Sequence, residues 1–405
     1  MKIEEVQGQL EYIAHSKKTH AYSPAVVKIL DLFINYVQDA EQASQQGKAA
    51  VWSSTYAWDW WQVPLLYACD IIPVSYSEMS RASDRDVVSI AENYYQFPVE
   101  TCSMVKATVG EFYLRKDVTS IRRIFGNATI CEPYNLAWEV LKNEGYEVHT
   151  NEAVYRGPSV KGKRLEQLVQ FFSEQMYDAA EWLTGSRTID EDKLRIELQR
   201  KNRIMEKMRI ILQLREKRPF YIRSLATIVL LNIGLNNYFG KPEEFEAAAD
   251  LLITEMQDTP INEEDLKKVI PLVWAGGTGQ EFGVYEVIDQ AGGALLGFRN
   301  APFKLCREDI PPVEALVRAV FDNQSAGAGV YARQVIEQEI DRLNATGLIL
   351  YGHIGCSYSG IEREIWRKYF QEKGVSCITL EGAFEIGPPS GQVITRIKAF
   401  IEMLA

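Results

Sequence analysis

Short apolar runs alternate with segments of helical periodicity along two stretches of the chain. In the first stretch KAAVWSSTYAW and YEVHTNEAV are strand-like, and PLLYACDIIPVSYS is a further apolar segment that ends in polar residues. Between them SIRRIFGNATIC leads into the helical segment EPYNLAWEVLKNEG. In the second stretch the runs are KKVIPLVWAGG, ALLGF, GLILYGH and VSCITLEG, again with helical patterns between or after them. Because alternating strands and helices are typical of a parallel sheet, we predict an α/β fold with two parallel-sheet regions.

The segment between these two stretches has helical periodicity throughout. EQLVQFFSEQMYDAAEWLTG is amphipathic and ends at Gly185, and a long charged helix after it ends at Pro219. No strand-like run interrupts this segment, so we predict a helical connecting region or a surface for a partner. The predicted organisation is an N-terminal helical segment (1–44), a first α/β domain (45–158), a helical region (159–265) and a second α/β domain (266–405).

Composition excludes several classes of protein. The chain has 405 residues, of which 46% are hydrophobic, enough for the cores of more than one domain. Its net charge of −11 argues against nucleic acid as a partner, because phosphate binding needs a basic surface. No window reaches about 18 uninterrupted apolar residues, and the N-terminus lacks the apolar core of a signal peptide. We therefore expect no membrane span and a cytoplasmic location, where the six cysteines stay reduced.

Three of the cysteines share one local context. Cys102, Cys131 and Cys356 each lie where an extended segment leads into a predicted helix. A helix N-terminus lowers the pKa of a thiol and favours a bound anion. Thiolates held in this way ligate metals or iron–sulfur clusters. The remaining three lack the context: Cys69, Cys306 and Cys377.

Two interpretations of the three cysteines are open. In α/β sheets ligands collect at the carboxyl ends of the strands, so thiols from both α/β halves would meet in a cleft between the domains. Three thiolates would leave one iron of a [4Fe–4S] cluster without a protein ligand, and an open position is typical of a catalytic metal site. The alternative is that all three are small core residues, because free cysteine is among the most buried residue types.

The residues around these cysteines resemble a known family. ETCSMVK, ATICEPYNLAWE and HIGCSYSGIE resemble the three cysteine motifs of the 2-hydroxyacyl-CoA dehydratase and benzoyl-CoA reductase family. VWSSTYAWDWWQVPLLYACDIIPV and EGAFEIGPPSGQVITRIKAFIEML are similar to that family's first strand and helix and to its C-terminal segment. The resemblance implies two Rossmann-like domains with a helical connecting region, and a [4Fe–4S] cluster on Cys102, Cys131 and Cys356.

The resemblance also implies an activity. It predicts one subunit of an oxygen-sensitive, heterodimeric hydro-lyase of amino-acid fermentation, which converts a (R)-2-hydroxyacyl-CoA into a 2-enoyl-CoA. It implies two protein partners, a homologous second subunit and an ATP-dependent iron–sulfur activator that injects one electron. The electron turns the acyl-CoA thioester into a ketyl radical anion, which expels hydroxide, while the protein positions the reacting groups.

Other functions within and beyond the family remain as alternatives. In the first alternative the chain is a reductase of benzoyl-CoA or of another small molecule. In the second it is a non-catalytic partner subunit that has a structural role or relays electrons. The double-cubane branch of the family needs extra cysteines in the second half, and the corresponding stretches VWAGGTGQ and LLGFRNAPF contain none.

The resemblance and the pattern single out a few further residues. Ser53 and Ser54 end the first predicted strand, where the family places polar residues that face the site; the alternative is a serine that caps the next helix. Glu78 follows the second strand and is a candidate acid/base group, or an exposed loop glutamate. His353 precedes Cys356 closely and is a candidate hydrogen-bond donor to a cluster sulfur or substrate, or a satisfied loop histidine.

Overall fold

A computed structural model provides the structure of the chain. It describes these residues: 8–53, 61–75, 84–128, 131–152, 160–277, 282–299, 303–323, 329–382 and 389–405. Ser54 and Glu78, two of the residues singled out above, lie outside them.

Two four-stranded sheets form the framework, and all their strand pairs are parallel. The first has the order β2-β1-β3-β4 and consists of β1 (Ala50–Ser53), β2 (Ile72–Ser75), β3 (Arg123–Ala128) and β4 (Glu147–Glu152). The second has the order β6-β5-β7-β8 and consists of β5 (Ile270–Gly276), β6 (Gly293–Phe298), β7 (Gly347–His353) and β8 (Ser376–Gly382). The predicted α/β class with two parallel-sheet regions is confirmed.

The two sheets have the same topology. In each, the chain moves from the first strand to an edge strand and then returns to the other side of the first strand. The direction therefore reverses between β1 and β3 in one sheet and between β5 and β7 in the other. Ligands of open α/β sheets bind at the carboxyl ends of the two strands that flank such a reversal.

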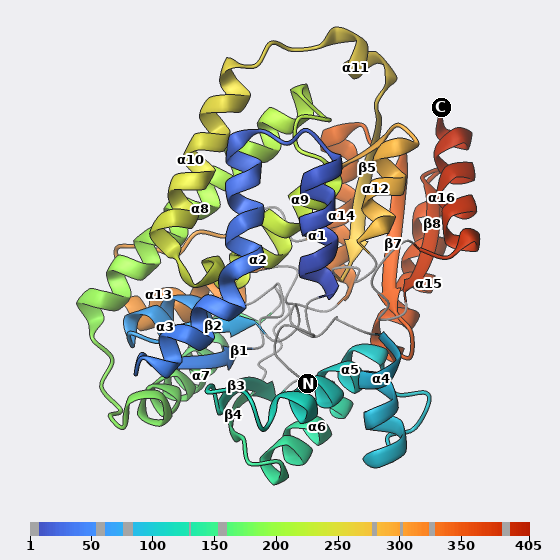
Figure 1. Ribbon diagram of the computed structural model, residues 1–405. Coiled ribbons are helices and arrows are strands. Elements are labelled where there is room, and N and C mark those ends of the chain that lie inside the picture. The colour runs from blue at the N-terminus through green and yellow to red at the C-terminus, as the bar shows by residue number, and fades with distance from the viewer. Residues whose placement is uncertain are drawn as a thin grey trace.

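Helices cover both faces of each sheet (Figure 1). Those of the N-terminal half are α1 (Gly8–Thr19), α2 (Pro24–Gln45), α3 (Gln62–Ala68), α4 (Asp84–Ser89), the π-helix η2 (Ile90–Tyr94), α5 (Ser103–Arg115) and α6 (Glu132–Asn143). Those of the C-terminal half are α12 (Gly283–Gln290), α13 (Pro312–Asp322), α14 (Gly329–Leu343), α15 (Ser357–Glu372) and α16 (Gly391–Leu404).

Alternate residues of the central strands enter different cores, as the two-residue period of a strand requires. In the first sheet Val51 and Phe125 pack with α3 and α7, whereas Trp52 and Ile124 enter a larger core. The residue Trp274 of the second sheet belongs to that larger core too. One apolar core therefore runs from one sheet to the other.

The middle of the chain is helical, as predicted. It contains α7 (Gly162–Thr184), α8 (Glu191–Lys217), α9 (Ser224–Ile228), the short helices η3 (Val229–Ile233), η4 (Gly234–Asn236) and η5 (Tyr238–Gly240), α10 (Pro242–Asp258) and α11 (Glu263–Lys268). Gly185 ends α7 in the left-handed conformation, with φ 78°, which glycine adopts without a steric cost.

These middle helices are part of the cores of the molecule. α7 packs against β4 and α13, and α8 packs against α3, α10 and α13 (Figure 1). α13 belongs by sequence to the predicted domain 266–405, yet its apolar residues share a core with Val51 and Phe125 of the first sheet. Within the described residues no helix is long and apolar enough to span a bilayer.

Candidate functional site

Each of the three cysteines singled out above is the N-cap residue of a helix. Cys131 caps α6 directly after β3, and Cys356 caps α15 directly after β7. Both therefore lie at a strand flanking the reversal of chain direction in their sheet. Cys102 caps α5, but a loop and the π-helix η2 precede it, so the expected extended strand is absent there.

Backbone contacts bring the start of α5 to the start of α15. The Ser103 N–H donates to the Ile354 carbonyl at 2.9 Å. Gly355 has φ +76°, and a Cβ added to it would lie 2.6 Å from the Glu100 carbonyl oxygen and 2.8 Å from that of Thr101. The loop that ends at Cys102 thus lies directly on the turn that ends at Cys356.

The three sulfur atoms lie in one environment. The Cys102 thiol is hydrogen-bonded to Cys356, and Cys131 interacts electrostatically with Cys356. Cys102 is buried, and Cys131 and Cys356 are half-buried against the same apolar core. Two thiols from the first α/β half and one from the second therefore interact with one another.

One of the three sulfurs accepts a hydrogen bond from its own helix start. The Ser359 N–H donates to Cys356 Sγ at 3.5 Å. The sulfurs of Cys102 and Cys131 accept no such capping hydrogen bond, and the N–H groups of Val105 and Tyr134 donate to the carbonyl oxygens of these two cysteines. A donor such as the Ser359 N–H stabilises negative charge on sulfur.

The pKa values of Cys102 and Cys131 move in the direction opposite to the one expected. The hydrogen bond with Cys356, followed by burial, raises the pKa of Cys102, and burial raises the pKa of Cys131. The helix N–H groups lower both values but do not outweigh these effects. Neighbouring thiols in an apolar site favour the neutral form unless a cation balances the charge, so metal binding here would release protons.

The three thiols are donors of the kind that iron–sulfur clusters use. Among the described residues no group of three or more His, Cys, Asp or Glu side chains converges on one metal ion. Around one tetrahedral ion the ligand sulfurs lie about 4 Å apart, whereas in an iron–sulfur cluster each thiolate binds a different iron. Cys102, Cys131 and Cys356 start three separate helices, so each thiolate would be able to bind a different iron.

Ser53 lies at the carboxyl end of β1, next to the reversal between β1 and β3. It is fully buried, it pairs with Ser75 across the sheet, and its Oγ has no hydrogen-bond partner among the described residues. The nearest described helix, α3, has Trp61 at its N-cap, so Ser53 does not cap it. A buried hydroxyl without a partner costs free energy, which a bound polar group would recover.

Three residues near the site were missed from the sequence. Ser103, next to Cys102, is buried and its Oγ also lacks a partner in the described part of the chain. Gly276 leaves no room for a side chain, because a Cβ would lie 2.1 Å from the Tyr351 carbonyl oxygen, and a Cβ on Gly277 would lie 3.1 Å from His353 Nε2. In the sequence, the two consecutive glycines after the buried strand VIPLVWA indicate this close approach of β5 to β7.

The other cysteines lie on other elements. Cys69 ends α3, Cys377 is part of β8, and Cys306 is buried against α8. None of them is an N-cap residue, in agreement with their separation from the triplet in the sequence.

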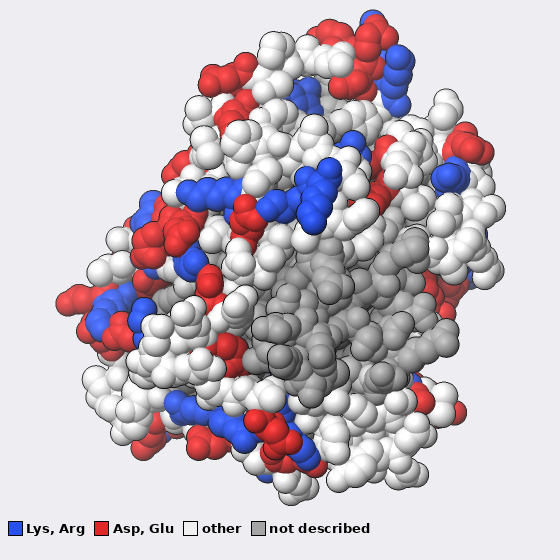
Figure 2. All heavy atoms as spheres, viewed as in Figure 1, with Lys and Arg blue, Asp and Glu red and all other residues white. Residues whose placement is uncertain are grey.

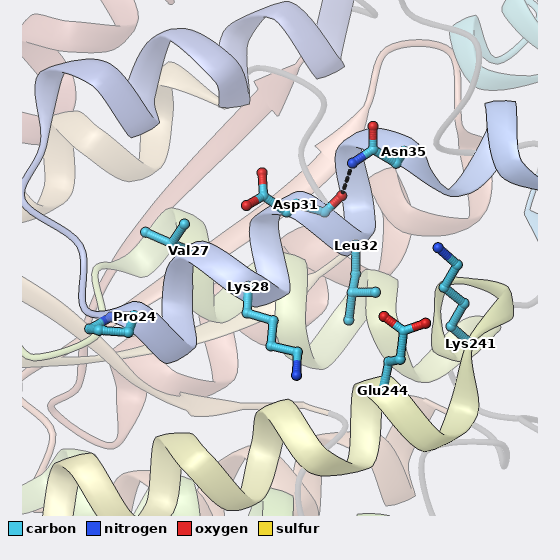
Figure 3. A pocket seen from close by; sticks show the side chains of 8 residues that line it. All are labelled: Pro24, Val27, Lys28, Asp31, Leu32, Asn35, Lys241 and Glu244. Carbon is cyan, nitrogen blue, oxygen red and sulfur yellow. Dashed lines mark hydrogen bonds between the residues drawn. The ribbon is translucent and has the colours of Figure 1, made fainter.

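A charged surface depression lies elsewhere, between α2 and α10 (Figure 3). Its lining includes both signs of charge, and it shares no residue with the strand ends and helix starts that carry the cysteines: Pro24, Val27, Lys28, Asp31, Leu32, Asn35, Lys241 and Glu244. On the same face of the molecule acidic and basic side chains are interspersed (Figure 2). This depression therefore has no relation to the cysteine site.

Comparison with known proteins supplies a family. The family model described as 2-hydroxyglutaryl-CoA dehydratase, D-component, matches residues 61–404. The matched range includes all three cysteines and both sheets apart from β1. A search of curated proteins finds no significant match.

Proposed function

We propose, from the premise that this chain belongs to the 2-hydroxyglutaryl-CoA dehydratase D-component family, that it is the iron–sulfur subunit of a 2-hydroxyacyl-CoA dehydratase. The reaction is the elimination of water from a (R)-2-hydroxyacyl-CoA to give a 2-enoyl-CoA. The observation that carries the proposal is that three thiols from both α/β halves are helix N-caps, with Cys131 after β3, Cys356 after β7, and Cys102 on the loop that contacts the turn before Cys356.

Cys102, Cys131 and Cys356 would hold a [4Fe–4S] cluster. When bound, this group supplies one-electron chemistry and an iron position open to a substrate oxygen. The N–H groups at the starts of α5, α6 and α15 would stabilise the charge on the three sulfurs. The buried position of Cys102 keeps bulk water away from the sulfur it carries.

The hydroxyls of Ser53, at the end of β1, and of Ser103, the residue after Cys102, would orient the acyl-CoA. Ser53 Oγ and Ser103 Oγ are buried donors that have no partner in the described residues, so each is available to a thioester or hydroxyl oxygen of a substrate. Ser54 and Glu78 complete the proposal. Ser54 follows Ser53 in the sequence and would supply a second hydroxyl, and Glu78 would be the group that moves a proton. The elimination needs such a proton acceptor because the substrate proton lost is weakly acidic.

Two protein partners belong to this proposal. A homologous second subunit would complete the enzyme, and an ATP-dependent iron–sulfur activator would deliver the electron. The proposed enzyme is cytoplasmic and does not bind nucleic acid.

The experiment is an iron determination with electron paramagnetic resonance on protein prepared anaerobically with its partner subunit. The expected result is about four irons per chain in the wild type and a loss of most of them in Cys356→Ala. Cys377→Ala is the matched control, because Cys377 is a half-buried thiol in β8 outside the triplet, and it should keep its iron.

Turnover tests the reaction separately from the cofactor. With activator and ATP, (R)-2-hydroxyacyl-CoA should be dehydrated and benzoyl-CoA should not be reduced. Wild-type protein without iron contradicts the cluster, and iron-loaded protein that reduces benzoyl-CoA instead contradicts the dehydratase assignment.

A further inference from the structure

A buried cysteine outside the triplet lies in the segment that leads from β6 to α13. Cys306 is 4% exposed, and the Nζ atom of Lys201 on α8 lies 3.7 Å from its sulfur. Lys201 is also 4% exposed. A lysine and a cysteine are thus buried together, with the amine directed at the thiol.

Within the described part of the chain, Lys201 lacks the ion pairs that its charged neighbours along α8 make. Its neighbours along α8 reach carboxylates of α10: Arg200 pairs with Glu243, Arg203 with Glu246 and Lys207 with Asp250. Lys201 has no carboxylate within ion-pair distance among the described residues, and the sulfur of Cys306 is its described hydrogen-bond partner. A buried amine without a counter-ion costs free energy, so its pairing with the thiol requires an explanation.

The backbone of Cys306 is held firmly in this orientation. The Asn202 side chain accepts from the Cys306 N–H at 2.8 Å and donates to the Cys306 carbonyl at 2.9 Å. The same amide group donates to Glu308 at 2.9 Å. Consecutive residues of α8 therefore fix the cysteine and present an amine to its sulfur.

We propose that Lys201 and Cys306 form an oxidation-sensitive pair that closes into a covalent sulfenamide. Hydrogen peroxide first oxidises the Cys306 thiol to a sulfenic acid and is itself reduced to water. The Lys201 amine then attacks the sulfur, the N–S bond forms, and the S–O bond breaks. Hydroxide leaves with a proton of the amine as a second molecule of water, so the linked pair is lighter than the reduced pair by two hydrogens.

The link would join α8 to the segment before α13. At present these parts are connected by the non-covalent contacts of Asn202 and by the packing of α13 on α8. A covalent bond there would constrain the unfolded chain over the loop from residue 201 to residue 306, as a disulfide does. Oxidation would therefore fix the helical middle of the chain to its second half.

The test is peptide mass spectrometry on the full-length protein before and after exposure to hydrogen peroxide, and after subsequent dithiothreitol. The expected result is a linked peptide pair that contains Lys201 and Cys306, lacks two hydrogens, and separates again in dithiothreitol. Lys201→Arg keeps the positive charge but removes the primary amine, and together with Cys306→Ser it should abolish the link.

The chain contains a matched control in Cys69, which interacts with Lys193. That amine is held by Asp70 at 2.6 Å and lies at the surface, so no link should form at Cys69. The urea midpoint of the oxidised wild type should rise and that of oxidised Cys306→Ser should not. Cys306 that stays reduced, or that proceeds to sulfinic acid without a link in the wild type, overturns the proposal whether or not the variants fold.

Discussion

At the scale of single residues, proximity distinguishes the three site cysteines better than acidity does. Burial raises the pKa of Cys69 to about 11 and that of Cys377 to about 12. For Cys102, in contrast, the largest influence on the pKa is the hydrogen bond with Cys356. A helix start therefore does not by itself make a thiolate in this protein, and the grouping of the sulfurs is what marks the site.

Asp289 provides a pH-dependent prediction at the same scale. Burial raises its pKa to about 6, against hydrogen bonds from the Ser224 N–H and Oγ and the charges of Arg215 and Arg223, which lower it. The folded state thus holds this proton more tightly than the unfolded state, so the stabilisation is present below about pH 4 and is lost as the pH rises through about 6.

The variant Asp289→Asn removes this titration. Relative to the wild type, its free energy of unfolding should increase by roughly 2–3 kcal/mol between about pH 4 and pH 7. Urea unfolding of both proteins at several pH values measures the difference. A difference that stays constant with pH contradicts a raised pKa for Asp289.

At the scale of elements, the sequence predicted the strands and most helices because each carries its own pattern. The buried strand GLILYGH and the stop at Gly185 depend on residues within a few positions of one another. The loop before Cys102 does not depend on local residues, because it contacts Ile354 and Gly355, which are distant in sequence. The packing of α13 on the first sheet was missed for the same reason, because the local periodicity of a helix does not indicate which sheet it packs against.

Gly355→Ala tests the contact that joins the two helix starts. An alanine there adopts a left-handed φ and also meets the Glu100 and Thr101 carbonyl groups, so we expect a loss of about 3 kcal/mol in the free energy of unfolding. Gly374→Ala is the control, since its φ is +82° and its Cβ would meet nothing within 4 Å. This control should lose only about 1 kcal/mol, as measured by urea unfolding.

Arg299 tests how α15 is held on the second sheet. It donates to Glu362 of α15 at 2.9 Å, with both side chains only 12% and 11% exposed, and its guanidinium lies 4.9 Å from the Trp366 ring centroid. Arg299→Met leaves the carboxylate of Glu362 half-buried without this partner, so we expect a loss of roughly 2–4 kcal/mol.

The exposed pair of Arg307 with Asp309 serves as the control for Arg299. Its side chains are 58% and 69% exposed, and Arg307→Met should leave the unfolding free energy nearly unchanged. Thermal or urea unfolding compares the two variants. Equal losses would show that burial of the Arg299 pair is unimportant.

At the scale of the whole molecule, the two sheets share one apolar core. That core contains α2, parts of α8 and α10, Trp52 of the first sheet and Trp274 of the second. The helical middle therefore stabilises both halves at once, instead of connecting two independent domains. Neither half buries its apolar residues fully without it.

This shared core predicts a single cooperative unfolding transition. Exposing one sheet to water would also expose the core residues of the other, so partial unfolding is costly. Tryptophan fluorescence and far-ultraviolet circular dichroism, followed together during urea unfolding of the metal-free chain, should give coincident curves. Two separated transitions would show that the halves unfold independently.

Because two of the three thiols come from one half of the chain and the third from the other, the complete set forms only in a chain whose halves are docked correctly. Cys102 and Cys131 come from one half, and Cys356 arrives only when the turn before α15 lies on the loop before α5. A chain whose halves dock in the wrong register presents an incomplete set of sulfurs and would bind the cluster poorly. Under the proposed function, metal loading would then be the last step of maturation, reached selectively by correctly folded chains.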